Sequence, residues 1–155
     1  MVDGGGGGPV RVGRTLEREA RSLETYAVRV ERTDALSVQA RVRGFSLELG
    51  ARRADPDAGF NPVETLLAAL GDCLLTALAF VADLSRVSVE RASLELRAER
   101  QDKPPLLTAI SYEWQVRTDL PDVRLERILA LAERNSTVFQ TVSRAVPITG
   151  GFQRI

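Results

Sequence analysis

The sequence predicts an α+β fold in which antiparallel β-sheets pack against a long central helix and a second helix pair. Three observations support this class. Stretches in which apolar and polar residues alternate, typical of half-buried strands, lie on both sides of one long apolar segment. An amphipathic helical pattern follows the second set of strands. With 155 residues, the chain is long enough to form one domain with its own core.

We expect the domain to span residues 14–155, preceded by a flexible glycine-rich segment over residues 1–13. The run from Gly4 to Gly8 cannot repay the conformational entropy of ordering. A phosphate-binding loop is a weaker interpretation, because no strand precedes the run and no Gly-Lys-Ser/Thr motif follows it. Residues 14–24 are highly charged and are compatible with a short helix or an irregular arm.

After Tyr26, apolar and polar residues begin to alternate with a period of two. It predicts three strands, near residues 28–31, 38–43 and 45–49, each with one buried face. Turn-forming residues separate these segments, and Gly44 marks a bulge or a bend.

The long apolar segment predicts a helix that begins at Asn61-Pro62 and ends near residues 84–86. Asn is a favoured N-cap residue, and Pro is tolerated at the first helical position. Apolar residues on nearly every face of this helix predict burial in a core or an interface. Asp72 and Asp83 interrupt the apolar run, so we expect a core helix rather than a membrane span.

The second half of the chain predicts two more paired strands, near residues 92–99 and 110–117, around a proline-containing loop. An amphipathic helix then begins after Pro121 and breaks at Asn135-Ser136. Thr137 and Gln140 could form the capping box of a short helix through Val142. Residues 146–148 predict a last edge strand, where proline is tolerated.

The amino-acid composition limits the kinds of catalytic and metal-binding sites that the chain can form. The chain has 21 basic and 21 acidic residues, no His and one Cys. No imidazole is available as a catalytic base, most zinc sites are excluded, and an intrachain disulfide is impossible. We expect no cofactor. Balanced charge argues against nucleic-acid binding, and the lack of an apolar leader predicts a cytoplasmic protein without membrane association.

Cys73 is therefore the most reactive candidate side chain. It lies well beyond the first turn of the long helix, so the helix dipole cannot activate it, and an activating cation, most plausibly an Arg, must come from elsewhere. A buried, inert cysteine is the alternative. Glu64 precedes it by nine residues and faces the opposite side of the helix, so the two could cooperate only through a bridging Arg or a partner subunit. Glu64 also suits a capping role at the third helical position.

Residues 61–73, which read Asn-Pro-Val-Glu-Thr-Leu-Leu-Ala-Ala-Leu-Gly-Asp-Cys, resemble the helix signature of the OsmC/Ohr proteins. These are the osmotically inducible protein C and organic hydroperoxide resistance families. The segment from Ser136 to Ile148 resembles the family's Cys-Pro-Val ending. The order of the predicted elements also fits an OsmC-like fold.

This resemblance implies an intertwined homodimer that reduces organic hydroperoxides with a thiol. In the family, the helix thiolate attacks the peroxide and becomes a sulfenic acid, a second Cys forms a disulfide with it, and a small thiol or lipoyl protein reduces that bond. Cys73 matches the attacking thiol, and Ser136 stands at the position of the second Cys. Glu64 matches a supporting carboxylate. Arg32 is the nearest match to the thiolate-stabilising Arg, although Arg29 or Thr33 could occupy its place.

Because Ser136 cannot form a disulfide, three functions remain. The first is a one-Cys peroxidase in which an external thiol or a lipoyl-type reductant reduces the Cys73 sulfenic acid directly. The second is a family member without peroxidase activity that binds a small hydrophobic ligand in the equivalent pocket. The third is a structural or interaction protein with an inert Cys.

Overall fold

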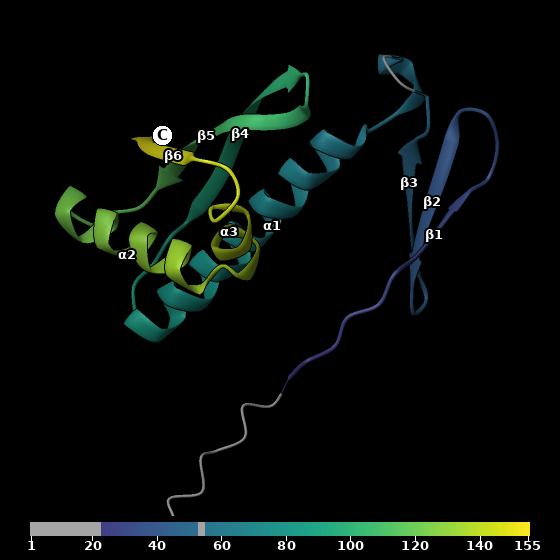
Figure 1. The fold of residues 1–155 in the computed structure, drawn as a ribbon. Coiled ribbons are helices and arrows are strands. Elements are labelled where there is room, and N and C mark those ends of the chain that lie inside the picture. Colours follow the sequence, from purple (N-terminus) through teal and green to yellow (C-terminus); the bar gives the residue numbers. More distant parts are fainter. Residues whose placement is uncertain (1–22, 53–54) are drawn as a thin grey trace, which may run out of the picture.

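The computed structural model describes residues 23–52 and 55–155 (Figure 1). The predicted flexible segment, residues 1–13, and most of the charged stretch after it lie outside the described residues. The elements follow in this order: β1 (Arg29–Arg32), β2 (Ser37–Val42), β3 (Phe45–Gly50), a 3-10 turn (Pro56–Ala58), α1 (Pro62–Ser85), β4 (Arg91–Asp102), β5 (Pro105–Arg117), α2 (Asp122–Asn135), α3 (Thr137–Val142) and β6 (Ile148–Arg154).

Two three-stranded sheets form, with the strand orders β1-β2-β3 and β4-β5-β6. The first sheet is antiparallel throughout, as predicted, and Arg43-Gly44 makes the turn between β2 and β3 rather than a bulge. The second sheet is mixed, because β6 runs parallel to β5. The expectation of antiparallel sheets was therefore wrong for the last strand. The chain between β5 and β6 contains α2 and α3, and a helical crossover of this kind returns it to the end of the sheet where β5 began.

The hydrophobic core lies where α1 and α2 pack beside the second sheet. Alternate residues of β5 are buried, as its period of two predicts. Fully buried side chains come from both helices and from this strand: Leu70, Leu74, Ile110, Trp114, Val116 and Leu125. The second sheet and the three helices thus form the body of the molecule.

The first sheet extends from this body as an arm beyond the N-terminal end of α1 (Figure 1). Some of its apolar side chains are exposed, with Phe45 at 70% and Leu47 at 54%, whereas Val38, Ala40, Val42 and Leu49 are half-buried.

Helix α1 is buried along one side in the single chain. Its buried residues form one stripe, from Leu70 to Ala82, whereas Ala68, Asp72 and Phe80 are exposed. The core of the body therefore covers one side of α1, and burial of its other side in an interface stays a prediction. By length and composition α1 could cross a bilayer, but core helices of globular proteins pass the same test, and α1 packs against α2, α3 and β4.

The two N-caps explain where α1 and α3 begin. Asn61 and Glu64 form a reciprocal capping box, in which the Glu64 N–H donates to Asn61 Oδ1 at 3.0 Å and the Asn61 N–H donates to Glu64 Oε2 at 2.9 Å. The cap of α3 is Ser136 rather than Thr137, which corrects the sequence prediction. Ser136 has an extended backbone, as an N-cap requires, and Thr137 is already helical.

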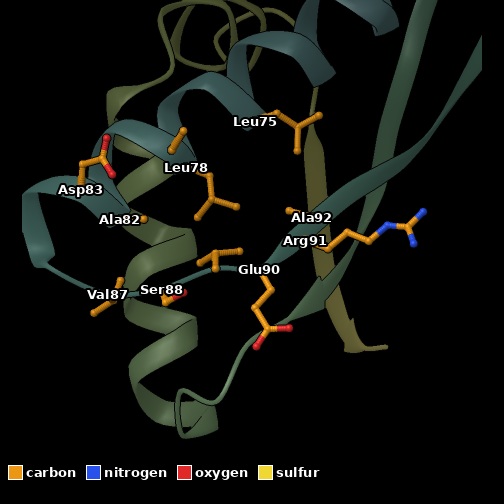
Figure 2. Close-up of a pocket in the computed structure, with 11 residues that line it drawn as sticks. Leu75, Leu78, Ala82, Asp83, Val87, Ser88, Glu90, Arg91 and Ala92 are labelled. Atoms are coloured by element: carbon orange, nitrogen blue, oxygen red, sulfur yellow. The ribbon is translucent and has the colours of Figure 1, made fainter.

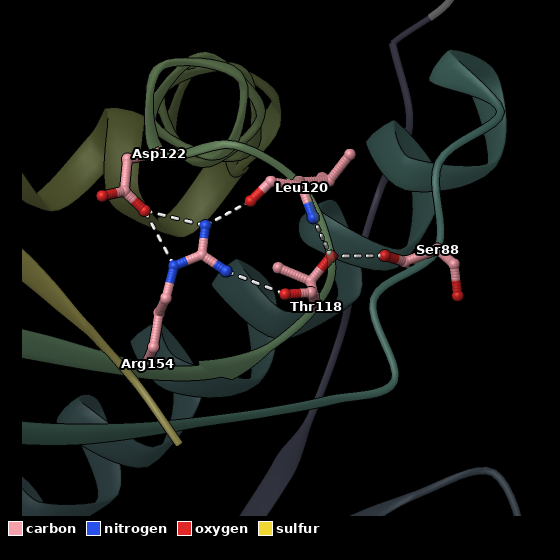
Figure 3. Close-up of polar contacts among 5 residues, drawn as sticks. All are labelled: Ser88, Thr118, Leu120, Asp122 and Arg154. Carbon is pink, nitrogen blue, oxygen red and sulfur yellow. Dashed lines mark hydrogen bonds and ion pairs between the residues drawn. The ribbon is translucent and has the colours of Figure 1, made fainter.

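Arg154 at the end of β6 fastens the last strand to the start of α2 (Figure 3). Its guanidinium donates to Asp122 Oδ1 at 2.7 Å, to the Thr118 carbonyl at 2.8 Å and to the Leu120 carbonyl. The Thr118 hydroxyl donates to the Ser88 carbonyl at 2.7 Å. These bonds hold two loops, the end of β6 and the start of α2 together at one end of the body.

Candidate functional site

Cys73 lies in the middle of α1 and is partly buried. At 100° per residue, its side chain points to the edge of the buried stripe, next to Leu70 and Ala77 and opposite to Glu64. A thiol in this position is accessible from one side while the body protects the other.

Ser136 is fully buried at the junction of α2 and α3. Its Oγ accepts a hydrogen bond from the Phe139 N–H at 3.2 Å, and α3 packs against α1. The structure therefore brings the element that begins at Ser136 to the helix that carries Cys73. In place of a second thiol, this position has a hydroxyl that caps a helix.

Glu64 acts as a helix cap in the structure. Its Oε2 accepts from the Asn61 N–H, and no ion pair joins Glu64 to an Arg among the described residues. It lines an open cavity of about 530 Å³ together with Phe60, Leu67 and Leu96.

Arg32 is exposed at the end of β1, on the arm. Its Nε donates to the Asp34 carbonyl at 3.0 Å, and its Nη2 donates to the Ala35 carbonyl at 3.1 Å. These bonds tie Arg32 to its own turn. Within one chain, the described residues show no hydrogen bond or ion pair from Arg32 to Cys73 or Glu64.

Two further cavities border α1. One, of about 650 Å³, lies between the arm and the start of the helix and is lined by Val38, Arg52, Pro62 and Arg100. The other, of about 350 Å³, lies between the C-terminal half of α1 and the segment that leads into β4 (Figure 2). Leu75, Leu78 and Ala82 give it an apolar wall, and Asp83 and Glu90 lie at its edge. Cys73 lines neither of them, nor the cavity at Glu64.

The sequence did not single out Tyr112, Trp114 or Glu133 as candidate site residues. The Tyr112 hydroxyl donates to Glu133 Oε1, and burial, together with this hydrogen bond, raises the pKa of Tyr112. Trp114 is buried, and its Nε1 has no hydrogen-bond partner. The sequence did offer one signal for this contact. A Tyr and a Trp on the apolar side of a strand have polar atoms that need hydrogen-bond partners when they are buried.

The described residues contain no group of three or more His, Cys, Asp or Glu side chains that could hold a metal ion. A family model described as OsmC-like protein matches residues 54–150. The chain belongs to the OsmC-like family. The match covers α1 with Cys73, α3 with Ser136 and both long strands of the body.

Solved structures of other OsmC-like proteins have the same fold. An OsmC-like protein from Mycoplasma pneumoniae superposes with a TM-score of 0.79 at 17% identity, covering 85% of this chain and 98% of that one. An organic hydroperoxide resistance protein OsmC from Legionella pneumophila gives a TM-score of 0.67 at 17% identity, covering 86% and 99%. The organic hydroperoxide resistance protein OhrB of Bacillus subtilis gives 0.62 at 13% identity, covering 83% and 98%. No curated protein matches the sequence.

Proposed function

We propose that this OsmC-like protein is a one-Cys, thiol-dependent peroxidase that reduces organic hydroperoxides through Cys73. The observation that carries the proposal is the partly buried thiol of Cys73 on α1, a helix that packs against α3, whose N-cap is Ser136. Two structural neighbours are named as organic hydroperoxide resistance proteins, which supports this substrate class.

The reaction then has two stages. The Cys73 thiolate attacks the distal oxygen of the hydroperoxide, the O–O bond breaks, and the alkoxide leaves as an alcohol after taking up a proton. Cys73 becomes a sulfenic acid. Because Ser136 cannot condense with it, an external thiol attacks the sulfenic sulfur, which releases water and leaves a mixed disulfide. A second thiol, or the second sulfur of a dihydrolipoyl group, reduces that disulfide and restores the Cys73 thiol.

The active unit in this proposal is a homodimer. The exposed arm and the uncovered side of α1, with Phe80 at 53% exposure, are the surfaces available to a second copy. An Arg from the partner's arm would supply the cation that one chain does not place beside Cys73. A scheme that depends on external thiols also suits the reducing cytoplasm.

The decisive experiment is mass spectrometry of the protein after it reacts with cumene hydroperoxide in the presence of a sulfenic-acid trap. We expect one trapped adduct, on Cys73, over a range of about 10 μM to 1 mM peroxide, which spans typical enzyme KM values. Cys73→Ser is the control and should give none. A wild-type thiol that stays unmodified over this range would refute the peroxidase.

A second variant tests the role of position 136. Ser136→Cys should increase turnover with a dithiol reductant if the resolving step is all that the chain lacks. Its α3 cap weakens, because sulfur is a poor acceptor for the Phe139 N–H. Thermal denaturation of the variant therefore has to show that it is folded. A folded variant with no gain would mean that the activating Arg is also missing.

Binding of a small hydrophobic ligand, without peroxidase activity, is the second candidate. The expected pocket lies beside Cys73; the cavity that bears on this candidate is the one of about 350 Å³ farther along α1, which has Leu75, Leu78 and Ala82 in its wall but is not lined by Cys73 (Figure 2). A fluorescent apolar probe should then bind equally to the wild type and to Cys73→Ser, and Ala82→Phe should abolish binding. If neither sulfenic acid nor bound probe is detected, the protein is structural and its Cys is inert.

A further inference from the structure

The outer face of the second sheet is open, because α1 and α2 pack on its other face (Figure 1). Alternate residues of β4 and β5 point outward, and those near the start of β4 and the end of β5 are polar or charged. The six that form what we term the charged face are Arg91, Ser93, Glu95, Glu113, Gln115 and Arg117. None of them has a part in the peroxidase scheme, so an inference about this face does not rest on the proposed function.

The pairing of β4 with β5 places like charges opposite each other twice. Arg91 lies opposite Arg117, and Glu95 lies opposite Glu113. Like charges directly opposite in an antiparallel pair are destabilising. Both pairs therefore destabilise the sheet of a single chain, and charges of opposite sign on another molecule would relieve the repulsion.

The single chain does not neutralise these four charges. No ion pair joins any of them to another side chain in the part of the chain that the structure describes. Their hydrogen bonds are long, since Arg117 Nε donates to the Ile155 backbone oxygen at 3.4 Å and Gln115 Nε2 donates to Glu95 Oε1 at 3.4 Å. All four charged residues are exposed and can therefore meet a partner.

The order of the charges along the strands makes the face self-complementary. The Arg pair and the Glu pair are four residues apart, which is about 14 Å along a strand, and the Ser93–Gln115 pair lies midway between them. A two-fold axis that runs across the strands over this middle pair places the Arg pair of one copy against the Glu pair of the other. Four ion pairs then form, two from each copy.

We propose that the charged face binds the charged face of a second copy of this chain in a weak, salt-sensitive contact. Three strands about 4.8 Å apart, each about seven residues long, give a patch of roughly 350 Å² per copy, against about 800 Å² in a standard stable interface. Exposed ion pairs also contribute little each. The contact is therefore reversible, and it is separate from any contact that the arm or the uncovered side of α1 makes.

Sedimentation velocity of the full-length protein tests this contact. At about 20 mM NaCl, the weight-average mass should rise as the protein concentration increases from about 10 μM to about 1 mM, a range suited to weak association. At about 500 mM NaCl, the mass should stay at that of the basic unit, whether this is one chain or a homodimer. We expect the apparent Kd to differ at least about tenfold between the two salt concentrations, because salt screens exposed charges.

Charge reversal on the face separates this contact from other association. Arg91→Glu combined with Arg117→Glu makes the face wholly acidic, and Glu95→Lys combined with Glu113→Lys makes it wholly basic. Neither double variant should associate with itself, because like charges then face each other. An equimolar mixture of the two should associate at least about tenfold more tightly than the wild type.

Arg124→Glu combined with Arg127→Glu, at exposed positions of α2, is the matched control. It changes the net charge as much as the acidic variant does, and it should associate as the wild type does. Circular dichroism verifies that each variant is folded.

Three results would overturn the proposal: a wild-type mass that does not rise at low salt, double variants that associate as the wild type does, or a mixture that does not associate. Association of the mixture without any in the wild type would assign the face to a different partner. None of these results bears on Cys73, because the sulfenic-acid experiment measures a residue on α1.

Discussion

Replacing Gly150 by Ala should destabilise the protein because a rigid aromatic ring occupies the space of the new methyl group. Gly150 lies opposite Tyr112 in the parallel pairing of β5 and β6. A Cβ at this position would lie 2.1 Å from Tyr112 Cζ and 2.4 Å from Cε2. Carbon atoms in contact normally stay about 3.5–4.0 Å apart, so the ring would have to move by more than about 1 Å.

The ring has little freedom to move. It makes edge-on contacts with Trp114 and Phe139, each at a centroid distance of 6.3 Å, and its hydroxyl is bonded to Glu133. Overpacking of this kind lowers the free energy of unfolding by about 1–3 kcal/mol. Gly151 supplies the control, since a Cβ there meets nothing within 4 Å. Both substitutions reduce the entropy of the unfolded chain by the same amount, so that contribution cancels in the comparison.

The assay is thermal and urea denaturation of Gly150→Ala and Gly151→Ala in parallel, followed by circular dichroism. The difference of about 1–3 kcal/mol corresponds to roughly 2–12 °C in Tm for a chain of this length. If Gly150→Ala is as stable as Gly151→Ala, the ring is free to move, and the tight packing inferred around Tyr112 is wrong.

Three other substitutions test the remaining contacts. Asn61→Ala removes the Oδ1 that accepts from the Glu64 N–H. Urea titrations should show a free energy of unfolding that is lower by about 1 kcal/mol. An unchanged free energy of unfolding would mean that the cap does not stabilise the helix. Arg154→Met should lower the free energy of unfolding by about 1 kcal/mol, and no more than that because the guanidinium is partly exposed. Arg97→Met, at an exposed position, is the control and should leave the free energy of unfolding almost unchanged. The pKa of Tyr112 is raised in the folded state, so the folded chain keeps a proton that the unfolded chain loses, and stability should fall as pH rises above about 10. Denaturation curves of Tyr112→Phe should show a smaller fall over that range, and an equal fall would contradict the assignment.

The strands and the long helix could be predicted because their signals are local. Alternation placed β1 to β5, and Asn61-Pro62 placed the start of α1, as the capping box confirms. Strand direction could not be predicted in the same way, since a period of two is the same for parallel and antiparallel pairing. The parallel register of β6 follows instead from the crossover through α2 and α3.

The candidate site was predicted less completely, and for a physical reason. Local sequence placed Cys73 on α1 and Glu64 at its cap, both within one helix. The Arg32 side chain donates to the backbone carbonyls of Asp34 and Ala35 in its own turn. The alternation of apolar and polar residues carries no information about such a contact. One side of α1 and much of the arm are exposed in the single chain, and the apolar pattern of the sequence does not say what, if anything, would cover them.

The late position of β6 has a consequence for the newly made chain. Synthesis proceeds from the N-terminus, so β5 and both following helices leave the ribosome before β6 does. Until Ile148–Arg154 arrives, one edge of β5 has unpaired backbone groups, and an open strand edge can recruit another nascent chain. The last seven strand residues therefore protect the chain from aggregation, and truncation within them should impair solubility before it affects the thiol.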